Sequence, residues 1–171
     1  VELICTTADD ITIENASCDK ITATQTLEYI EDIDTSLKEI KRISKNNSKF
    51  VNVSIHWDYF RFYGPEKKIN DLIHEAFRAH CFHQMLPLDL NGKLKKLGYK
   101  NISSQNLSYL ITNRDNNSPA IFYETMFSKF ALSQGVSADK VDDWKKQLNK
   151  SEKLGNFGFT SFPVLTAAYL G

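Results

Sequence analysis

The sequence predicts an α/β protein with a parallel sheet, and the pattern between residues 18 and 57 carries that prediction. Residues 19–24 form a short run with strand character, and residues 50–57 form a longer one rich in β-branched side chains. Between them, Leu37, Ile40 and Ile43 recur at helical spacing. A strand, a helix and a strand in this order are typical of parallel strands joined by a crossover helix.

The rest of the chain continues with strands and helices separated by turn residues. We expect Asp34 to cap the first helix with its side chain and Ser137 to cap the last one. The turn after the first helix is expected at residues 45–49, since asparagine tolerates a positive φ. Further strands are expected at residues 1–8, 101–112 and 158–171, and further helices at residues 68–82, 87–98, 120–134 and 138–154.

Length and composition limit the class of protein. With 171 residues, 42% of them hydrophobic, the chain is expected to form one globular unit. The 21 basic and 21 acidic residues cancel, so a nucleic-acid partner is not expected. The sequence contains no apolar run of the roughly 18 residues that a membrane span needs. Three cysteines, at positions 5, 18 and 81, lack the spacing of a disulfide framework and favour the reducing cytoplasm.

One segment resembles a known family. Residues 16–44, "ASCDKITATQTLEYIEDIDTSLKEIKRIS", are similar to the class I S-adenosylmethionine-dependent methyltransferases, in particular to their small-molecule branch. In that family, an Asp-led strand is followed by a Leu-Glu-His/Tyr-Val loop and an Ala-Leu-x-Glu-Ile-x-Arg helix. The residues in register are Asp19, Gln25, Leu27, Glu28, Tyr29, Asp32, Leu37, Glu39, Ile40 and Arg42.

The resemblance covers nearly all of the chain and implies its organisation. It implies a partial methyltransferase domain over residues 1–171, with a Rossmann-like, seven-stranded, mostly parallel sheet and helices on both faces. Residues 58–98 resemble a helical substrate-covering insertion and the helix after it, and residues 119–154 resemble a helical segment before the last strand. The similarity begins at the family's third strand, so we expect strands 1 and 2 to be absent.

The glycine loop of the family is also missing from the sequence. Relatives hold the amino-acid end of the cofactor on a Gly-x-Gly loop, where the backbone approaches the ligand closely. The seven glycines, at positions 64, 92, 98, 135, 155, 158 and 171, never form Gly-x-Gly. We therefore expect this chain to be the C-terminal part of a methyltransferase. The missing N-terminal half would be supplied in cis or by a partner chain.

The resemblance also implies site residues for S-adenosylmethionine and for a small-molecule acceptor. The cofactor-binding positions are Thr7, Ala8, Thr24 and Gln25, with Thr7 where the family usually has Asp. The catalytic positions are His80 and Tyr29, and the substrate-binding positions are His56, Trp57, Tyr59 and His83.

Several of these residues have alternative interpretations. His80 could orient a substrate or accept a proton, or it could be a helix-surface histidine. Trp57 could line a pocket or pack in the core, and Cys81 is interpreted as a buried structural thiol. The sequence "HCFH" invites a metal site, but no second cluster supplies further ligands, so none is predicted.

Two functions follow from the sequence. The first is transfer of a methyl group from S-adenosylmethionine to a small molecule, which the register of residues 25–42 favours. The second is a non-catalytic methyltransferase-like subunit or interaction module, which the absent glycine loop and Thr7 favour.

Overall fold

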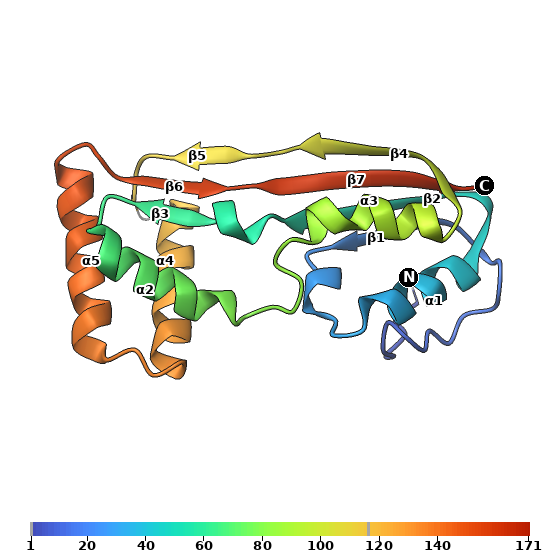
Figure 1. Cartoon of the computed structure of the whole chain (residues 1–171), viewed down its shortest axis with the longest axis horizontal. Coiled ribbons are helices and arrows are strands. Elements are labelled where there is room, and N and C mark those ends of the chain that lie inside the picture. The colour runs from blue at the N-terminus through green and yellow to red at the C-terminus, as the bar shows by residue number, and fades with distance from the viewer. Residues whose placement is uncertain (1, 116) are drawn as a thin grey trace. The chain divides into compact units, whose positions relative to one another are not determined.

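The computed structural model describes residues 2–115 and 117–171, and their contacts cluster into two compact units (Figure 1). Unit 1 contains residues 2–56, 81–107 and 163–171. Unit 2 contains residues 57–80 and the described part of residues 108–162. The single globular unit expected from the length of the chain is therefore divided into two. The chain crosses from one unit to the other four times.

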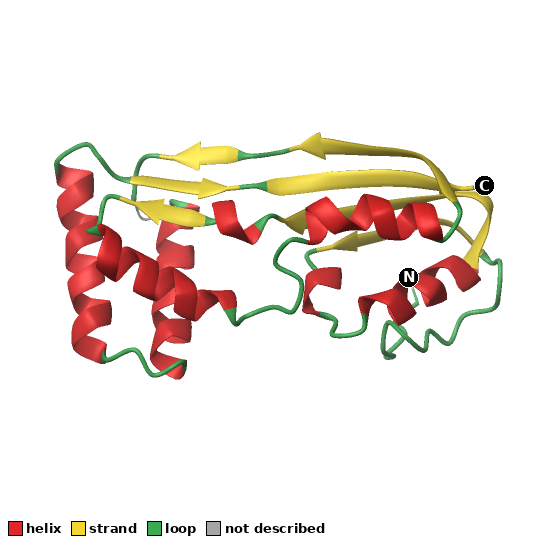
Figure 2. Ribbon diagram, viewed as in Figure 1, coloured by secondary structure: helices red, strands yellow, loops and turns green. Residues whose placement is uncertain are grey.

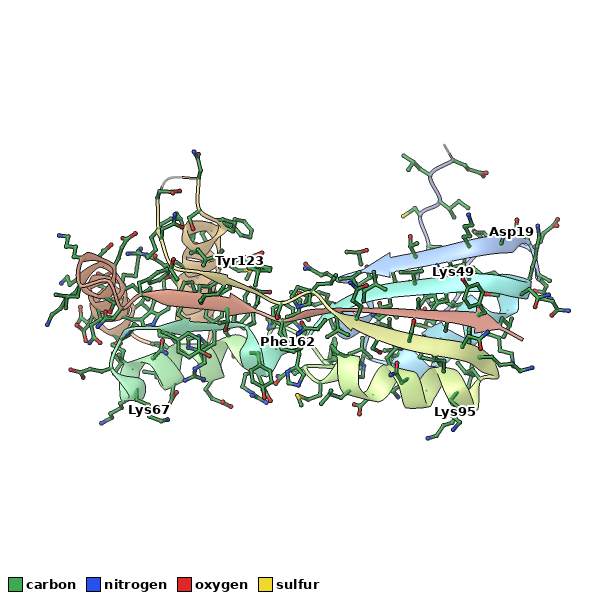
Figure 3. The ribbon with its side chains drawn as sticks, turned by 90° about the horizontal axis from the view of Figure 1, so that it is seen from above. Asp19, Lys49, Lys67, Lys95, Tyr123 and Phe162 are labelled. Carbon is green, nitrogen blue, oxygen red and sulfur yellow. The ribbon has the colours of Figure 1, made fainter. Side chains whose placement is uncertain are left out.

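Unit 1 is built on a four-stranded sheet with the order β1-β2-β7-β4. The strands are β1 (Cys18–Thr24), β2 (Ser44–Ile55), β7 (Pro163–Leu170) and β4 (Tyr99–Asn106), and their order can be followed in Figure 3. Strands β1 and β2 are parallel, which confirms the arrangement predicted from the strand–helix–strand pattern. Strand β7 is antiparallel to both of its neighbours.

Two helices of unit 1 cover the same face of its sheet (Figure 2). Helix α1 (Ile33–Ile43) follows the short 3-10 turn η1 (Leu27–Tyr29), and helix α3 (Leu86–Lys96) precedes β4. Their apolar side chains pack on the sheet because each helix places its buried residues along one stripe. The resulting core contains Leu27, Ile33, Leu37, Ile40, Phe50, Leu86, Leu90, Leu94, Tyr99, Ala168 and Leu170.

Unit 2 combines a small antiparallel sheet with three helices. The sheet has the order β3-β6-β5, formed by β3 (Arg61–Tyr63), β6 (Gly158–Ser161) and β5 (Tyr109–Ile111). The helices are α2 (Lys67–Arg78), α4 (Pro119–Ser133) and α5 (Ala138–Lys153), and the 3-10 turn η2 (Trp57–Tyr59) opens the unit. The core is aromatic: Phe62, Phe127, Trp144 and Phe159 are fully buried, and Tyr123, labelled in Figure 3, stacks on Phe159.

Two hydrogen-bonded side chains join β3 to the helices of unit 2. Asn70 donates to the carbonyl of Phe62 and accepts from Trp144 Nε1, at 2.8 and 2.9 Å. His74 accepts from Phe62 N through Nε2 at 3.0 Å, while its Nδ1 lies 2.6 Å from the carbonyl of Asn70. These buried polar groups satisfy one another, so they fix how β3 meets α2 and α5.

No helix among the described residues has the length and apolar character needed to cross a bilayer.

Three predicted strands differ from the structure. Residues 2–8 form no strand and are mostly exposed, because no described strand offers them a hydrogen-bonding partner. The single strand expected at residues 158–171 is two strands, β6 and β7, in different sheets. The break falls at Phe162 and Pro163, where β7 starts with a residue that has no backbone N–H. The strand expected at residues 101–112 is similarly divided into β4 and β5.

The predicted sheet also differs from the observed one. The expectation that strands 1 and 2 are absent is not borne out, because the N-terminal part of the chain contains the parallel strands β1 and β2. Seven strands are present among the described residues, but they form sheets of four and three strands. Of the strand pairs, β1 with β2 is parallel and the others are antiparallel, so the sheet is not mostly parallel.

The helix caps were only partly predictable. Asp32, not Asp34, caps α1, since its carboxylate accepts from Thr35 N at 3.0 Å. Ser137 occupies the N-cap position of α5 as expected, but its side chain makes no capping hydrogen bond. The turn expected at residues 45–49 is not observed, because these residues belong to β2; within it, Asn47 does adopt the positive φ that asparagine tolerates, at 62°. Asn47 lies in an irregular stretch of β2, between Ser44, which pairs with Cys18, and Lys49, which pairs with Lys20.

Replacing Asp32 with alanine is expected to lower the thermal unfolding midpoint by about 2–4 °C, because α1 loses the side-chain acceptor at its first turn. Asp34→Ala is the matched control, since that change removes an exposed ion pair with Lys93 and a first-turn carboxylate but leaves the capping hydrogen bond of Asp32 in place. Scanning calorimetry of the two variants measures the difference. A loss for Asp34→Ala as large as for Asp32→Ala would contradict this assignment of the cap.

Candidate functional site

A pocket in unit 1 brings together two segments that are about twenty residues apart in the sequence. Its volume is about 500 Å³, and it is lined by Thr7, Ala8, Asp9, Tyr29, Ile30, Glu31 and Asp32. Three of the residues expected at the site therefore share one pocket: Thr7, Ala8 and Tyr29. Thr24 and Gln25 are not among its lining residues. Gln25 instead follows the last residue of β1 in the left-handed region, with a φ of 47°, and donates its N–H to the carbonyl of Val53.

The segment that follows Thr7 to Asp9 is held against α1 by one arginine and one glutamate. Arg42 donates to the carbonyls of Ile11 and Ile13 at 2.7 and 2.8 Å, and to Asn15 Oδ1. Glu39 pairs with Arg42 at 2.6 Å and accepts from Ile11 N at 3.0 Å. A guanidinium has five donors in a fixed geometry, so one side chain can hold several carbonyls of an irregular segment. Glu39 and Arg42, two residues of α1 that carry the family resemblance, therefore have a structural role: they hold residues 11–15 in place.

The other wall of the pocket is organised by the buried Glu28. Its side chain is 0% exposed, and Oε1 accepts from Ile55 N at 3.4 Å, at the end of β2. Its main-chain carbonyl accepts from Phe82 N and His83 N, at 3.0 and 3.1 Å. Glu28 thus joins the turn after β1, the end of β2 and the segment that leads into α3.

Burial changes the ionisation of Glu28 and of its neighbour. Desolvation raises the pKa of Glu28, and hydrogen bonds from backbone amides partly oppose that effect. The carboxyl atom Oε2 is buried without a hydrogen-bond partner among the described residues. Desolvation, followed by the charges of Glu28 and Cys81, raises the pKa of Tyr29 to about 12. The phenol of Tyr29 therefore stays neutral at physiological pH and can act only through its O–H group.

The histidines expected at the site are dispersed. His83 Nε2 lies 2.8 Å from the carbonyl of Ile30, so in the tautomer with a proton on Nε2 it fastens residues 81–85 to the pocket wall. His56 is buried at the end of β2, 6% exposed. His80 belongs to unit 2. No group of three metal-ligating side chains gathers anywhere in the described part of the chain, the "HCFH" segment included.

Unit 2 contains a cleft of about 620 Å³ between η2, β3 and α2. Trp57 and His80, two of the residues expected at the site, both line it. The ring centroids of Trp57 and His80 are 4.2 Å apart in an edge-on arrangement, and His80 stacks on Phe77 at 4.0 Å. His80 Nδ1 lies 2.7 Å from the carbonyl of Phe77, and burial lowers its pKa. Trp57 is both pocket lining and core, since it is 8% exposed.

Tyr59 lies apart from these residues, in a different groove of unit 2. This groove has a volume of about 280 Å³ and is also lined by Tyr63, Tyr109 and Phe162. The ring centroids of Tyr59 and Phe162 are 5.4 Å apart. Tyr59 therefore does not share a pocket with Trp57 and His80, although it is only two residues from Trp57.

The burial of Glu28 and the charged rim of the unit 2 cleft are not predicted by the sequence patterns above. Glu28 is buried by segments that are far away in the sequence, namely β2 and residues 81–83, so no local pattern indicates it. The rim pairs Arg61 with Asp71 and Arg78 with Asp58. In the sequence, Arg61 stands inside the aromatic run of residues 59–63. Its spacing of ten residues from Asp71, across a turn and into a helix, is a weak signal that could have indicated the pair.

Comparison with known proteins supports the fold. A family model for a methyltransferase domain matches residues 1–52. The structure of the YcgJ protein from Bacillus subtilis is similar with a TM-score of 0.57 at 14% identity, covering 96% of this chain and 68% of that one. An S-adenosylmethionine-dependent methyltransferase from Thermotoga maritima gives a TM-score of 0.54 at 10% identity, covering 100% and 65%. This is a methyltransferase-like α/β fold.

A third structure contains the cofactor. The phosphoethanolamine N-methyltransferase 2 of Haemonchus contortus, in complex with S-adenosyl-L-methionine, gives a TM-score of 0.52 at 16% identity. The similarity covers 95% of this chain and 35% of that one. No curated protein matches the sequence. The shares covered show that the three matched structures are longer than this chain, and what they have in common with it is the fold.

The buried carboxyl of Glu28 predicts a pH dependence of stability. Above the ordinary carboxyl pKa of 4.5, the unfolded chain loses the Glu28 proton while the folded chain retains it. The stability contributed by Glu28 is therefore complete below this pKa and falls as pH rises toward the folded value. Glu28→Gln keeps an acceptor for Ile55 N but cannot ionise. We expect its unfolding free energy, relative to wild type, to increase as the pH is raised from about 4 to 7.

Urea unfolding of both proteins at several pH values measures this difference. His74, whose pKa is lowered to about 4 by burial, also makes stability depend on pH, with the opposite sign. Its contribution is common to both proteins and cancels in the subtraction. Parallel stability profiles for wild type and Glu28→Gln would show that the carboxyl ionises as freely in the fold as outside it.

Proposed function

We propose that this chain takes part in methyl transfer from S-adenosylmethionine to a small-molecule acceptor, with unit 1 binding the methyl donor. One observation carries the proposal. The pocket of unit 1 joins residues 7–9 to residues 29–32, and both segments lie within the stretch that matches the methyltransferase family model. They are also segments that the sequence resemblance assigns to cofactor and methyl transfer.

The residues of the pocket fit the proposed donor. A volume of about 500 Å³ lies within the range of small-molecule sites. S-adenosylmethionine carries a sulfonium and an ammonium group, and the pocket presents three carboxylates, those of Asp9, Glu31 and Asp32. The hydroxyl of Thr7 can donate or accept one hydrogen bond. We propose that Thr7 and Ala8 border the adenosine part, with Thr24 and Gln25 at the end of β1 close to the donor.

Methyl transfer from a sulfonium needs no covalent bond between the protein and either reactant. When bound, S-adenosylmethionine supplies a methyl carbon on a positively charged sulfur. The acceptor atom attacks this carbon with its lone pair, the electron pair of the carbon–sulfur bond returns to sulfur, and the acceptor loses a proton. Alignment of the two reactants can then lower the barrier by about 7–11 kcal/mol.

The chain offers two groups for orientation and proton transfer. Tyr29, held neutral by its raised pKa, can orient a reactant by hydrogen bonding. His80 has a lowered pKa, so its imidazole is neutral at pH 7 and can accept the acceptor's proton. We propose these roles for Tyr29 and His80. His56, Trp57, Tyr59 and His83 remain the proposed acceptor-binding set, with Trp57 supported most directly because it shares a cleft with His80.

We further propose that another segment, in cis or on a partner chain, pairs with β1. Among the described strands, β1 pairs only with β2 and so lies at the edge of its sheet. Such an edge is a template for a further strand. The greater length of the matched structures is consistent with this proposal. Three free cysteines support a reducing compartment such as the cytoplasm.

A non-catalytic role is the second candidate. It is favoured by the absence of Gly-x-Gly from the sequence and by Thr7 at a position that is usually Asp in the family. In that role the methyltransferase-like fold would serve as an interaction module, for example by supporting a catalytic partner. The two candidates differ in whether the pocket binds the methyl donor.

Titration calorimetry with S-adenosylmethionine distinguishes them. The titration should use this chain and the full product of its gene. We expect micromolar binding by at least the longer product, and a loss of at least tenfold on Ala8→Phe, because the added ring fills the pocket. Ala138→Phe, at an exposed position in α5, is the matched control. No binding by either protein would reject the enzyme and leave the interaction module.

A further inference from the structure

We propose that the cleft of unit 2 takes an uncharged molecule with a flat aromatic or alicyclic body. Its role as the methyl acceptor rests on the function proposed above, whereas the binding itself does not. The floor of the cleft is aromatic, and the charges on its rim balance.

The floor of the cleft is made of rings that are already packed against one another. Trp57 meets His80 edge-on at 4.2 Å and Phe60 edge-on at 4.8 Å, and Phe77 stacks on His80 at 4.0 Å. Leu72, 36% exposed, extends this apolar surface along α2. These rings contact the deeper core, since Phe77 also stacks on Phe127 at 3.9 Å. The floor is therefore preformed, and a flat apolar ligand can cover it at little cost in side-chain entropy.

The rim carries charge but no net charge. Among the lining residues, three cationic side chains (Arg61, Lys68 and Arg78) face three carboxylates (Asp58, Asp71 and Glu75), so the sum is zero. The carboxylate of Asp71 is bound by both Arg61 and Lys67. Arg78 binds Asp58 and lies 3.8 Å from Glu75.

The pairing on the rim disfavours ionic ligands. An anion would have to compete with Asp58 or Asp71 for the guanidinium groups, and a cation would have to compete with Arg61 or Arg78 for the carboxylates. Lys68, the remaining cation of the rim, is exposed, so water and salt screen its charge. The floor adds no charge at neutral pH. Burial lowers the pKa of His74 to about 4 and lowers that of His80 below its ordinary value. An uncharged ligand keeps every pair intact and gains the apolar contact.

Two fluorescent probes with the same body test this inference. N-phenyl-1-naphthylamine is uncharged, and 8-anilinonaphthalene-1-sulfonate is a close analogue with one sulfonate added. We expect the neutral probe to bind with one-to-one stoichiometry and at least fivefold more tightly than the sulfonate. Equal or tighter binding of the sulfonate, or no saturable binding of the neutral probe, would overturn the proposal.

A matched pair of variants locates the binding. Leu72→Glu places a carboxylate on the apolar wall of the cleft, and we expect it to weaken binding of the neutral probe at least tenfold. Leu132→Glu makes the same change on α4, where the side chain is 46% exposed and outside the cleft. Equal weakening by both variants would place the probe elsewhere and reject the site. Failure to bind S-adenosylmethionine would reject the proposed function but not this site, because probe binding needs no methyl donor.

Discussion

The burial of Glu28 is the constraint on which the pocket of unit 1 depends. One residue holds the end of β2 with its side chain and the start of residues 82–83 with its carbonyl. A buried carboxyl is costly unless it is hydrogen-bonded or protonated. Here its backbone contacts and its raised pKa reduce that cost together. The adjacent Tyr29 is thereby placed at the pocket with its own ionisation suppressed.

Arg42 and Glu39 provide the complementary restraint on the opposite wall. The segment after Asp9 has no regular secondary structure, so its polar backbone groups need side-chain partners. Arg42 and Glu39 supply these partners from one face of α1, through Ile11 and Ile13. Helix α1 therefore has two functions in the fold. Its apolar side chains pack on the sheet, and its polar side chains Glu39 and Arg42 hold the irregular segment that contains Ile11 and Ile13. The family-like register of the sequence is explained here by structural contacts rather than by catalytic ones.

Local pattern was sufficient to predict the existence of the helices and the parallel pair β1 and β2, because apolar spacing and strand–helix–strand order are local signals. It did not fix every helix end, since α2 stops at Arg78 and residues 79–82, expected to be helical, are not. It failed where pairing depends on distant segments. Residues 2–8 have strand composition but no described partner, and residues 158–171 join two sheets through Phe162 and Pro163. The candidate site shows the same division. The resemblance named Thr7, Ala8 and Tyr29, which line one pocket, whereas the contacts of Glu28 and the rim pairs of unit 2 exist only in the folded chain.

Residues 7–9 and 29–32 are proposed to hold the methyl donor. The most direct test is an amide chemical-shift titration of the full gene product with S-adenosylhomocysteine, which has the donor's shape without the transferable methyl group. We expect saturable shifts that are largest in these two segments. Binding with the largest shifts outside them, or an absence of shifts throughout unit 1, would contradict the assignment.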